Sequence, residues 1–296
     1  MSNLCNLNGV ITPEAKTTIS VLDRGFLFGD SIYEVLGTNG GVPFAFPEHL
    51  ERLRASADGL RMRIEVDDRT ILRRIKATLA EAKNQESYVR IIVTRGIGTA
   101  PNIDLVHAPG PCTVLILVRP LPAMPGGEGN LAIIDRMRND RRALDPAFKT
   151  GNYLNNVLGL AEAKAQGASD AVFLNGAGCV TEASTSNVWI VEDSACHTPP
   201  LEAGLLSGIT RRLLLAMCRE QGLRYSERDL TKRQLLQADE VFTTSTLRHV
   251  YPITKLDGQA VRDGKPGPIT TDLAKRFDTY CARRLAQVYA PEWSTL

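Results

Sequence analysis

The chain has 296 residues, of which 43% are apolar and 23% charged, and its formal net charge is +2. This composition is typical of a globular protein long enough for two modest domains or one large one. A charge so close to zero, without a long basic run, gives no electrostatic basis for a nucleic-acid or membrane-surface partner. The longest apolar run, residues 114–118, is far below the ~20 residues of a membrane-spanning helix.

The N-terminus lacks the basic start and apolar stretch of a signal peptide, so we expect a cytoplasmic protein. The six cysteines are widely spaced and none forms a C-x-x-C pair. The four histidines are also dispersed. These spacings predict neither a disulfide framework nor a metal site.

In the first half of the chain, residues 20–22 are predicted to form a short strand ahead of the turn-like triplet at 23–25. Residues 31–36 alternate like a strand, and Asn39-Gly40 after them is typical of a hairpin. Apolar spacing predicts helices over 49–60 and from Asp67 or Asp68 to about 83. Two further strands are predicted over 88–94 and 112–118.

Residues 119–130 hold three prolines and three glycines, which marks a linker. We therefore predict an N-terminal domain over 1–118, an interdomain loop over 119–130 and a C-terminal domain over 131–296. In the second domain, strands are expected at 131–134, 171–174, 187–191 and 240–244, and helices at 152–166 and 209–221. This order predicts an α+β fold, with a smaller N-terminal α/β domain and a larger C-terminal domain built on a barrel-like mixed sheet.

Lys149 stands apart from the other lysines because it lies between Ala147-Phe148 and a predicted apolar helix. An amine partly removed from water is available in its neutral form for Schiff-base chemistry. The ordinary alternative is a surface lysine whose stem packs on apolar neighbours.

Three other features suit an anionic ligand. The turn at 206–208 opens a helix, which can bind phosphate or can simply be capped by Ser207. The hydroxyl run 243–246 and Arg52 offer further phosphate donors, although each also fits an ordinary strand end or a solvated helix face. Glu182 is placed to hold a pyridine nitrogen in its protonated form, or to cap a turn.

In this order and spacing, seven motifs resemble the class IV aminotransferases, the fold-type IV pyridoxal-phosphate enzymes. They are DRGFLFGDSIYEV (23–35), HLERLRASA (49–57), YVRIIVTRG (88–96), FKTGNYLNNVL (148–158), VTEASTSNVW (180–189), LLSGITR (205–211) and ADEVFTTST (238–246). The resemblance implies two α+β domains with pyridoxal 5'-phosphate between them, in a homodimer whose partner subunit lines the pocket.

The resemblance also implies roles for single residues. Lys149 forms the internal aldimine and moves the substrate proton, and Glu182 pairs with the pyridine nitrogen. Leu206 packs on the ring and Tyr153 reaches the phenolic oxygen. The implied phosphate ligands are Arg52, Ile209, Thr210 and Thr246.

Substrate contacts are implied for Tyr33, Tyr88, Arg90 and Leu247. Tyr88 and Arg90 resemble a strand of branched-chain aminotransferases, but Gly37 stands where that group commonly has arginine. The spacing from Lys149 to Tyr153 is one residue shorter than in that group and is more like that of D-amino-acid aminotransferases and aminodeoxychorismate lyases. The arginine and histidine by which D-amino-acid aminotransferases hold the substrate carboxylate are absent from residues 96–102. Arg24 with Arg90 is an alternative carboxylate site.

We therefore expect transamination between a branched-chain or other apolar L-amino acid and a 2-oxo acid such as 2-oxoglutarate. The alternatives are a D-amino-acid or (R)-amine transaminase, an aminodeoxychorismate lyase, and a non-enzymatic module that binds a phosphorylated ligand. Trp189 and Trp293 are predicted to be packing residues.

Overall fold

The computed structural model describes residues 2–123 and 128–296 and divides into two compact units. Unit 1 comprises residues 1–123, 148–152 and 283–296, and unit 2 comprises 124–147 and 153–282. Of the predicted linker, residues 119–120 belong to strand β6 and 129–130 to strand β7. Residues 124–127 lie outside the described part of the chain.

Two segments of the predicted C-terminal domain group with unit 1 instead. Phe148–Asn152 does so because its backbone bonds to the first sheet: Tyr33 N donates to Lys149 O at 3.0 Å. Arg283–Leu296 does so because Arg284 Nη2 donates to Glu48 Oε1 at 2.8 Å. Both groupings depend on contacts between residues more than a hundred positions apart, which local patterns do not contain.

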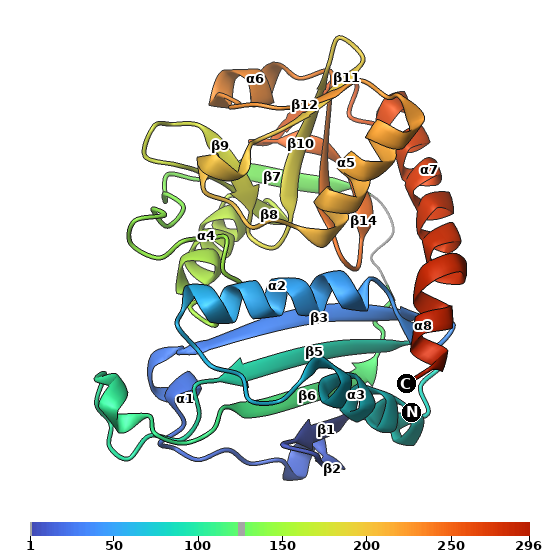
Figure 1. The fold of residues 1–296 in the computed structure, drawn as a ribbon. Helices are drawn as coiled ribbons and strands as arrows, with labels where there is room; N and C mark the ends of the chain where they lie inside the picture. The colour runs from blue at the N-terminus through green and yellow to red at the C-terminus, as the bar shows by residue number, and fades with distance from the viewer. Residues whose placement is uncertain (1, 124–127) are drawn as a thin grey trace. The chain divides into compact units, whose positions relative to one another are not determined.

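Unit 1 is built on a six-stranded sheet of order β2-β1-β6-β5-β3-β4, in which every pairing is antiparallel (Figure 1). Its strands are β1 (Leu4–Leu7), β2 (Val10–Pro13), β3 (Ser31–Asn39), β4 (Val42–Pro43), β5 (Ser87–Thr94) and β6 (Thr113–Pro120). Its helical segments are η1 (Glu14–Lys16), α1 (Arg24–Phe28), α2 (Phe46–Gly59), α3 (Asp68–Ala82), η2 (Leu105–His107), η4 (Leu285–Tyr289) and α8 (Ala290–Ser294).

Local sequence accounts for most of these elements. Strand β5 alternates buried and half-buried residues, as expected for a sheet with one core face. Asp67 caps α3 by accepting from Thr70 N at 2.7 Å. Gly40 and Gly41 have φ of 60° and 76° in the β3–β4 turn, which confirms the hairpin.

The strand predicted at 20–22 is wrong. Ser20 closes a turn there, since its carbonyl accepts from Asp23 N at 3.0 Å. Asp23 then caps α1 through a bond from Gly25 N at 2.8 Å. The apolar pair that suggested a strand, Val21 and Leu22, lies within this turn.

Unit 2 contains a mixed sheet whose ends meet. Its strands are β7 (Gly129–Ile133), β8 (Asp170–Leu174), β9 (Val180–Ala183), β10 (Asn187–Glu192), β11 (Ala195–Thr198), β12 (Tyr225–Glu227), β13 (Glu240–Ser245), β14 (His249–Leu256) and β15 (Gln259–Ala260). The pairings run β10-β13-β14-β7-β8-β9, and β9 pairs with β10 again. These six strands form a closed barrel, which confirms the predicted barrel-like sheet.

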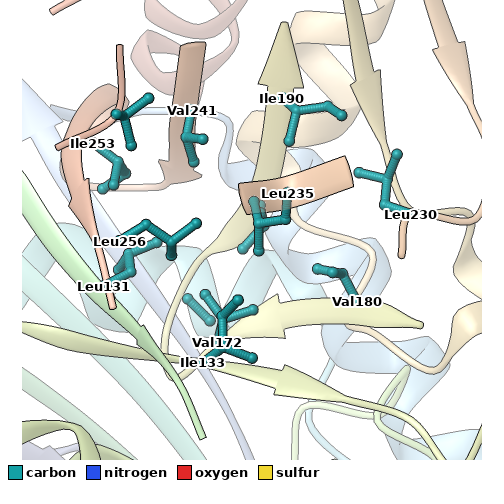
Figure 2. Close-up of a cluster of buried hydrophobic side chains, with 13 residues drawn as sticks. Leu131, Ile133, Val172, Val180, Ile190, Leu230, Leu235, Val241, Ile253 and Leu256 are labelled. Atoms are coloured by element: carbon teal, nitrogen blue, oxygen red, sulfur yellow. The ribbon is translucent and has the colours of Figure 1, made fainter. Parts of the chain in front are cut away.

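Figure 2 shows the side chains that fill this barrel. They come from all six strands, and Leu230 and Leu235 join them from outside the ring. Most are apolar and under 4% exposed, so the interior is a packed core and leaves no room for a ligand. Functional side chains of unit 2 must therefore lie at the strand ends or on the outer face.

The helical segments of unit 2 are α4 (Leu154–Ala165), η3 (Leu201–Ala203), α5 (Ile209–Gln221), α6 (Lys232–Gln237) and α7 (Pro268–Arg284), whose last two residues are counted with unit 1. Helix α4 packs on β7 and β8 through Ala163 and Phe173. Gly159 permits this approach, because a Cβ there would lie 2.3 Å from the Phe173 ring. No helix in the described ranges has both the length and the apolar composition to cross a membrane.

Candidate active site

Unit 1 fixes the backbone around Lys149 from two sides. Lys149 N donates to Ser56 Oγ on α2 at 3.1 Å, and Lys149 O accepts from Tyr33 N on β3 at 3.0 Å. Phe148 packs on Gly59, where a Cβ would lie 2.2 Å from its ring. Gly151 N donates to Ser31 O at 2.7 Å. The FKTG stretch is thus an ordered seat for a half-buried lysine.

Tyr33 collects two cations on its side chain. Lys149 Nζ lies 3.3 Å from the Tyr33 hydroxyl and 4.4 Å from the ring centroid. The Arg90 guanidinium carbon lies 4.1 Å from the same centroid. In the β3–β5 register, Gly37 is opposite Tyr88 and Val35 is opposite Arg90, which puts Tyr33, Tyr88 and Arg90 on one face of the sheet.

The two arginines predicted to bind substrate differ in their contacts. Arg24 is 3% exposed and donates to Asp30 Oδ2 at 3.0 Å and to the carbonyl oxygens of Asn102 and Ile103 at 2.7 and 2.9 Å. Arg90 is half-buried, and its buried Nε has no hydrogen-bond partner among the described residues. Arg24 therefore holds a loop, whereas Arg90 has a donor left for a ligand.

Arg52 lies in a buried cluster. Its Nε and Nη2 donate to the two oxygens of Glu34, each at 2.7 Å, and His49 Nδ1 lies 2.6 Å from Glu34 Oε2. Burial alone would raise the pKa of Glu34, but the Arg52 ion pair and the hydrogen bonds overcome it and lower that pKa to about 2. Burial holds the pKa of His49 below its usual value, so its ring is neutral and Nδ1–H is the donor to the carboxylate.

Glu182 lies on β9 in unit 2 and is 5% exposed. Its Oε1 accepts from Arg138 Nε at 2.9 Å, and its Oε2 accepts from Leu206 N at 3.0 Å and from Asn187 Nδ2 at 3.4 Å. Arg138 also donates to Asn155 Oδ1 at 3.0 Å. These donors hold an anionic carboxylate at one end of the barrel wall.

The turn before α5 is shaped by Asn187 and Gly208. Asn187 Nδ2 donates to Leu206 O at 2.9 Å, and a Cβ on Gly208 would lie only 2.0 Å from Asn187 Oδ1. The following residues Ile209 and Thr210 are buried and open a 13-residue helix, which confirms the predicted start. No side chain of the described residues caps that helix and no acidic residue lies in its first turn, which leaves N–H donors for an anion.

The remaining predicted residues of unit 2 lie at element ends. Thr246 and Leu247 are half-buried in the turn between β13 and β14, and Tyr153 is half-buried at the start of α4. Next to them in sequence, Thr244 accepts from Trp189 Nε1 at 3.0 Å. Trp189 is fully buried and stacks on Phe242 with centroids 5.4 Å apart, as expected of a packing residue. Trp293 packs against Phe46 at 5.5 Å.

The donor set fits pyridoxal phosphate. Unit 2 supplies a carboxylate for a pyridine nitrogen and a helix N-terminus for a phosphate, and unit 1 supplies a primary amine and a buried arginine. Among the described residues, no cluster of three or more His, Cys, Asp or Glu side chains has the arrangement of a metal site. The chemistry on offer is therefore covalent attachment to an amine with protonation of a ring nitrogen.

Sequence analysis missed the residues that support these groups. Arg138 lies in a stretch with four arginines at 136–142, and no local signal separates it from its exposed neighbours. His49, Arg52 and Ser56 share the i, i+3, i+7 spacing of one helix face. A polar face of this kind normally faces water, and here it is buried. Glu34 lies within a recognised motif, but no role was predicted for it.

Comparison with known proteins agrees with this chemistry. A family model described as amino-transferase class IV matches residues 31–256. A Methanocaldococcus jannaschii protein provisionally named a branched-chain-amino-acid aminotransferase is 34% identical over 92% of this chain and 94% of its own. A Bacillus licheniformis D-alanine aminotransferase is 32% identical over 90% and 93% of the two chains.

A solved structure is also similar: a branched-chain amino acid aminotransferase from the source abbreviated T.th., with pyridoxamine 5'-phosphate. It has a TM-score of 0.87 and 27% identity, and the match covers 96% of each chain. The protein therefore belongs to the class IV aminotransferases, a family of pyridoxal-phosphate-dependent transaminases.

Proposed function

We propose that the enzyme transfers the amino group of a branched-chain or other apolar L-amino acid to a 2-oxo acid such as 2-oxoglutarate. The observation that carries the proposal is the pairing of Arg90 and Lys149 on the Tyr33 ring, at 4.1 and 4.4 Å. An α-amino acid has its carboxylate one bond from the carbon that bears the amino group. A carboxylate ligand must therefore lie close to the reactive lysine, and Arg90 meets that condition.

The residues then divide the work. Bound pyridoxal phosphate supplies the electron sink for cleaving the bond from the α-carbon to hydrogen. Lys149 holds the cofactor through Nζ and carries the proton that leaves that carbon. Glu182 keeps the ring nitrogen protonated. Arg52, the α5 N-terminus at Ile209 and Thr210, and Thr246 bind the phosphate, while Leu206 and Tyr153 contact the ring and its phenolic oxygen.

Arg90→Gln tests the carboxylate contact. We expect kcat/KM for L-leucine to fall ~10–100-fold, the effect of losing a charge-assisted hydrogen bond. An amine without a carboxylate should lose nothing comparable. Arg119→Gln, a change at an exposed arginine on the neighbouring strand, is the matched control. Equal losses for L-leucine and the amine in Arg90→Gln would remove Arg90 from carboxylate binding.

The second candidate is a D-amino-acid or (R)-amine transaminase. The 32% identical Bacillus licheniformis relative is named a D-alanine aminotransferase, which favours keeping this alternative. Single-turnover reactions with L-leucine, D-alanine and (R)-1-phenylethylamine distinguish the two candidates. Pyruvate release from aminodeoxychorismate without any added 2-oxo acid would instead identify a lyase.

We also propose a homodimer that uses an apolar surface of unit 1. Arg24 holds the carbonyls of Asn102 and Ile103, and Gly98 N donates to Leu22 O at 2.9 Å, so two loops lie side by side. Exposed apolar side chains cover both loops, and so large a group marks an association surface. They are Ile19, Val21, Phe26, Ile97, Ile103, Leu105 and Val106, between 47% and 78% exposed.

Ile103→Glu tests this surface. A charge at the 78% exposed Ile103 should convert the dimer to a monomer in light scattering, because a buried unpaired carboxylate opposes association. Val10→Glu, at a 65% exposed apolar residue on β2, is the matched control and should remain dimeric. An unchanged mass for Ile103→Glu would exclude this surface.

The cytoplasmic location expected from the sequence is part of the same proposal. All six cysteines are free thiols, in keeping with a reducing compartment.

A further inference from the structure

One face of helix α2 is polar and buried. His49, Arg52 and Ser56 follow one another at helical spacing, and they are 0%, 8% and 1% exposed. Ser56 accepts from Lys149 N at 3.1 Å, and the other two contact Glu34 on β3. The same helix face therefore fixes the reactive lysine and the arginine assigned to phosphate.

The contacts of Glu34 fix the orientation of the Arg52 guanidinium. Both Glu34 oxygens grip the Nε–Nη2 edge at 2.7 Å, which prevents rotation about the bond to Nε. His49 Nδ1 then holds Oε2 at 2.6 Å and prevents rotation of the carboxylate. The order of contacts runs from His49 to Glu34 to Arg52, with each group holding the next.

This cluster is costly for the fold. Glu34 and His49 are fully buried, and a buried ion pair is often no more stable than apolar residues of the same volume. His49 Nε2 is buried without a hydrogen-bond partner among the described residues, which adds a further penalty. An arrangement of this cost is better explained by a need to hold a cation in one orientation than by stability.

We infer that Glu34 and His49 are positioning residues that preset Arg52 to receive the cofactor phosphate. The inference rests on the proposed function, in which Arg52 binds that phosphate. It makes a specific demand: Glu34 and His49 must govern affinity for the phosphate group and must not govern attachment of the ring at Lys149. A merely structural role would weaken both.

Two cofactor forms separate these roles, because pyridoxal lacks the phosphate of pyridoxal phosphate. The full-length apoprotein is titrated with each, and the dissociation constants are compared. Glu34→Gln should weaken pyridoxal phosphate on the order of 10-fold while changing pyridoxal less than about 3-fold, since one charged partner of Arg52 is lost. Glu48→Gln, a carboxylate on the same helix that binds Arg284 instead, is the matched control and should change neither.

His49 supplies a second test if Glu34→Gln fails to fold. His49→Leu removes the donor to Glu34 and should lower the preference for pyridoxal phosphate over pyridoxal. His49→Asn keeps an N–H donor at that position and should restore part of the preference. An unchanged preference in His49→Leu would overturn its positioning role.

Arg52→Gln distinguishes failure of this inference from failure of the proposed function. Selective loss of pyridoxal phosphate in Arg52→Gln, with equal or no losses for both ligands in Glu34→Gln, would leave Arg52 as the phosphate ligand and overturn the positioning role. No selective loss in Arg52→Gln would mean that the phosphate assignment itself is wrong, and the inference would fall with it.

Discussion

Lys149→Ala is expected to abolish transamination, with a loss in kcat of roughly 10⁴-fold or more, as for other residues that act directly in the covalent chemistry. Lys149 is assigned two tasks, holding the cofactor and moving the substrate proton, and alanine can do neither. Steady-state turnover with L-leucine and 2-oxoglutarate measures the effect. The variant should remain folded, because the anchoring bonds at 149 involve backbone N and O.

Lys16→Ala is the matched control, since Lys16 is an exposed lysine of the same unit. It should retain full activity. The decisive comparison is the rate of Lys149→Ala with added methylamine, which supplies a free amine for proton transfer. Substantial turnover by Lys149→Ala without an added amine would refute the assignment of Lys149.

Glu182→Gln should have the second-largest effect. An amide cannot accept from both Arg138 Nε and Leu206 N, because its own NH₂ must face one of these donors. The ring nitrogen also loses its anionic partner, so the rate of α-proton removal should fall on the order of 10²-fold, the typical cost of removing a preorganised electrostatic group. Arg138, 7% exposed, loses its ion pair, which should lower the free energy of unfolding by about 3 kcal/mol.

Stopped-flow half-reactions and chemical denaturation measure these two effects separately. Glu162→Gln is the matched control: Glu162 pairs with Arg136, but both side chains are about a third exposed, and such a pair contributes little. Arg138→Gln should lie between the two, because Glu182 keeps its bonds from Leu206 N and Asn187. A wild-type half-reaction rate in Glu182→Gln would remove Glu182 from its role.

Much of the fold follows from local patterns. Helix α5 begins and ends at the predicted residues, 209 and 221, because a capping glycine follows its apolar face. Strands β3 and β5 start within one residue of prediction since each alternates against one core. The interior strand β14 and helix α7 were not predicted. Pro252 interrupts the strand pattern of β14, and only pairing with β13 and β7 makes that segment a barrel strand.

The chemistry of the site was easier to predict than its supports. Lys149 and Glu182 were recognised from their motifs, and each is held by the structure at an element boundary or strand. Arg138, Glu34 and His49 were not, because their roles arise from contacts made across the fold, 15 to 44 residues apart in sequence. A charged side chain in an isolated sequence looks the same whether it is solvated or buried.

The most direct test of the account is borohydride reduction of the pyridoxal-phosphate-loaded enzyme, followed by proteolysis and mass spectrometry, with and without prior incubation with L-leucine. The account predicts one pyridoxyl-phosphate adduct, on Lys149, that disappears when L-leucine has donated its amino group and returns when 2-oxoglutarate is added. An adduct on another lysine, or an adduct on Lys149 that no amino donor removes, would contradict it.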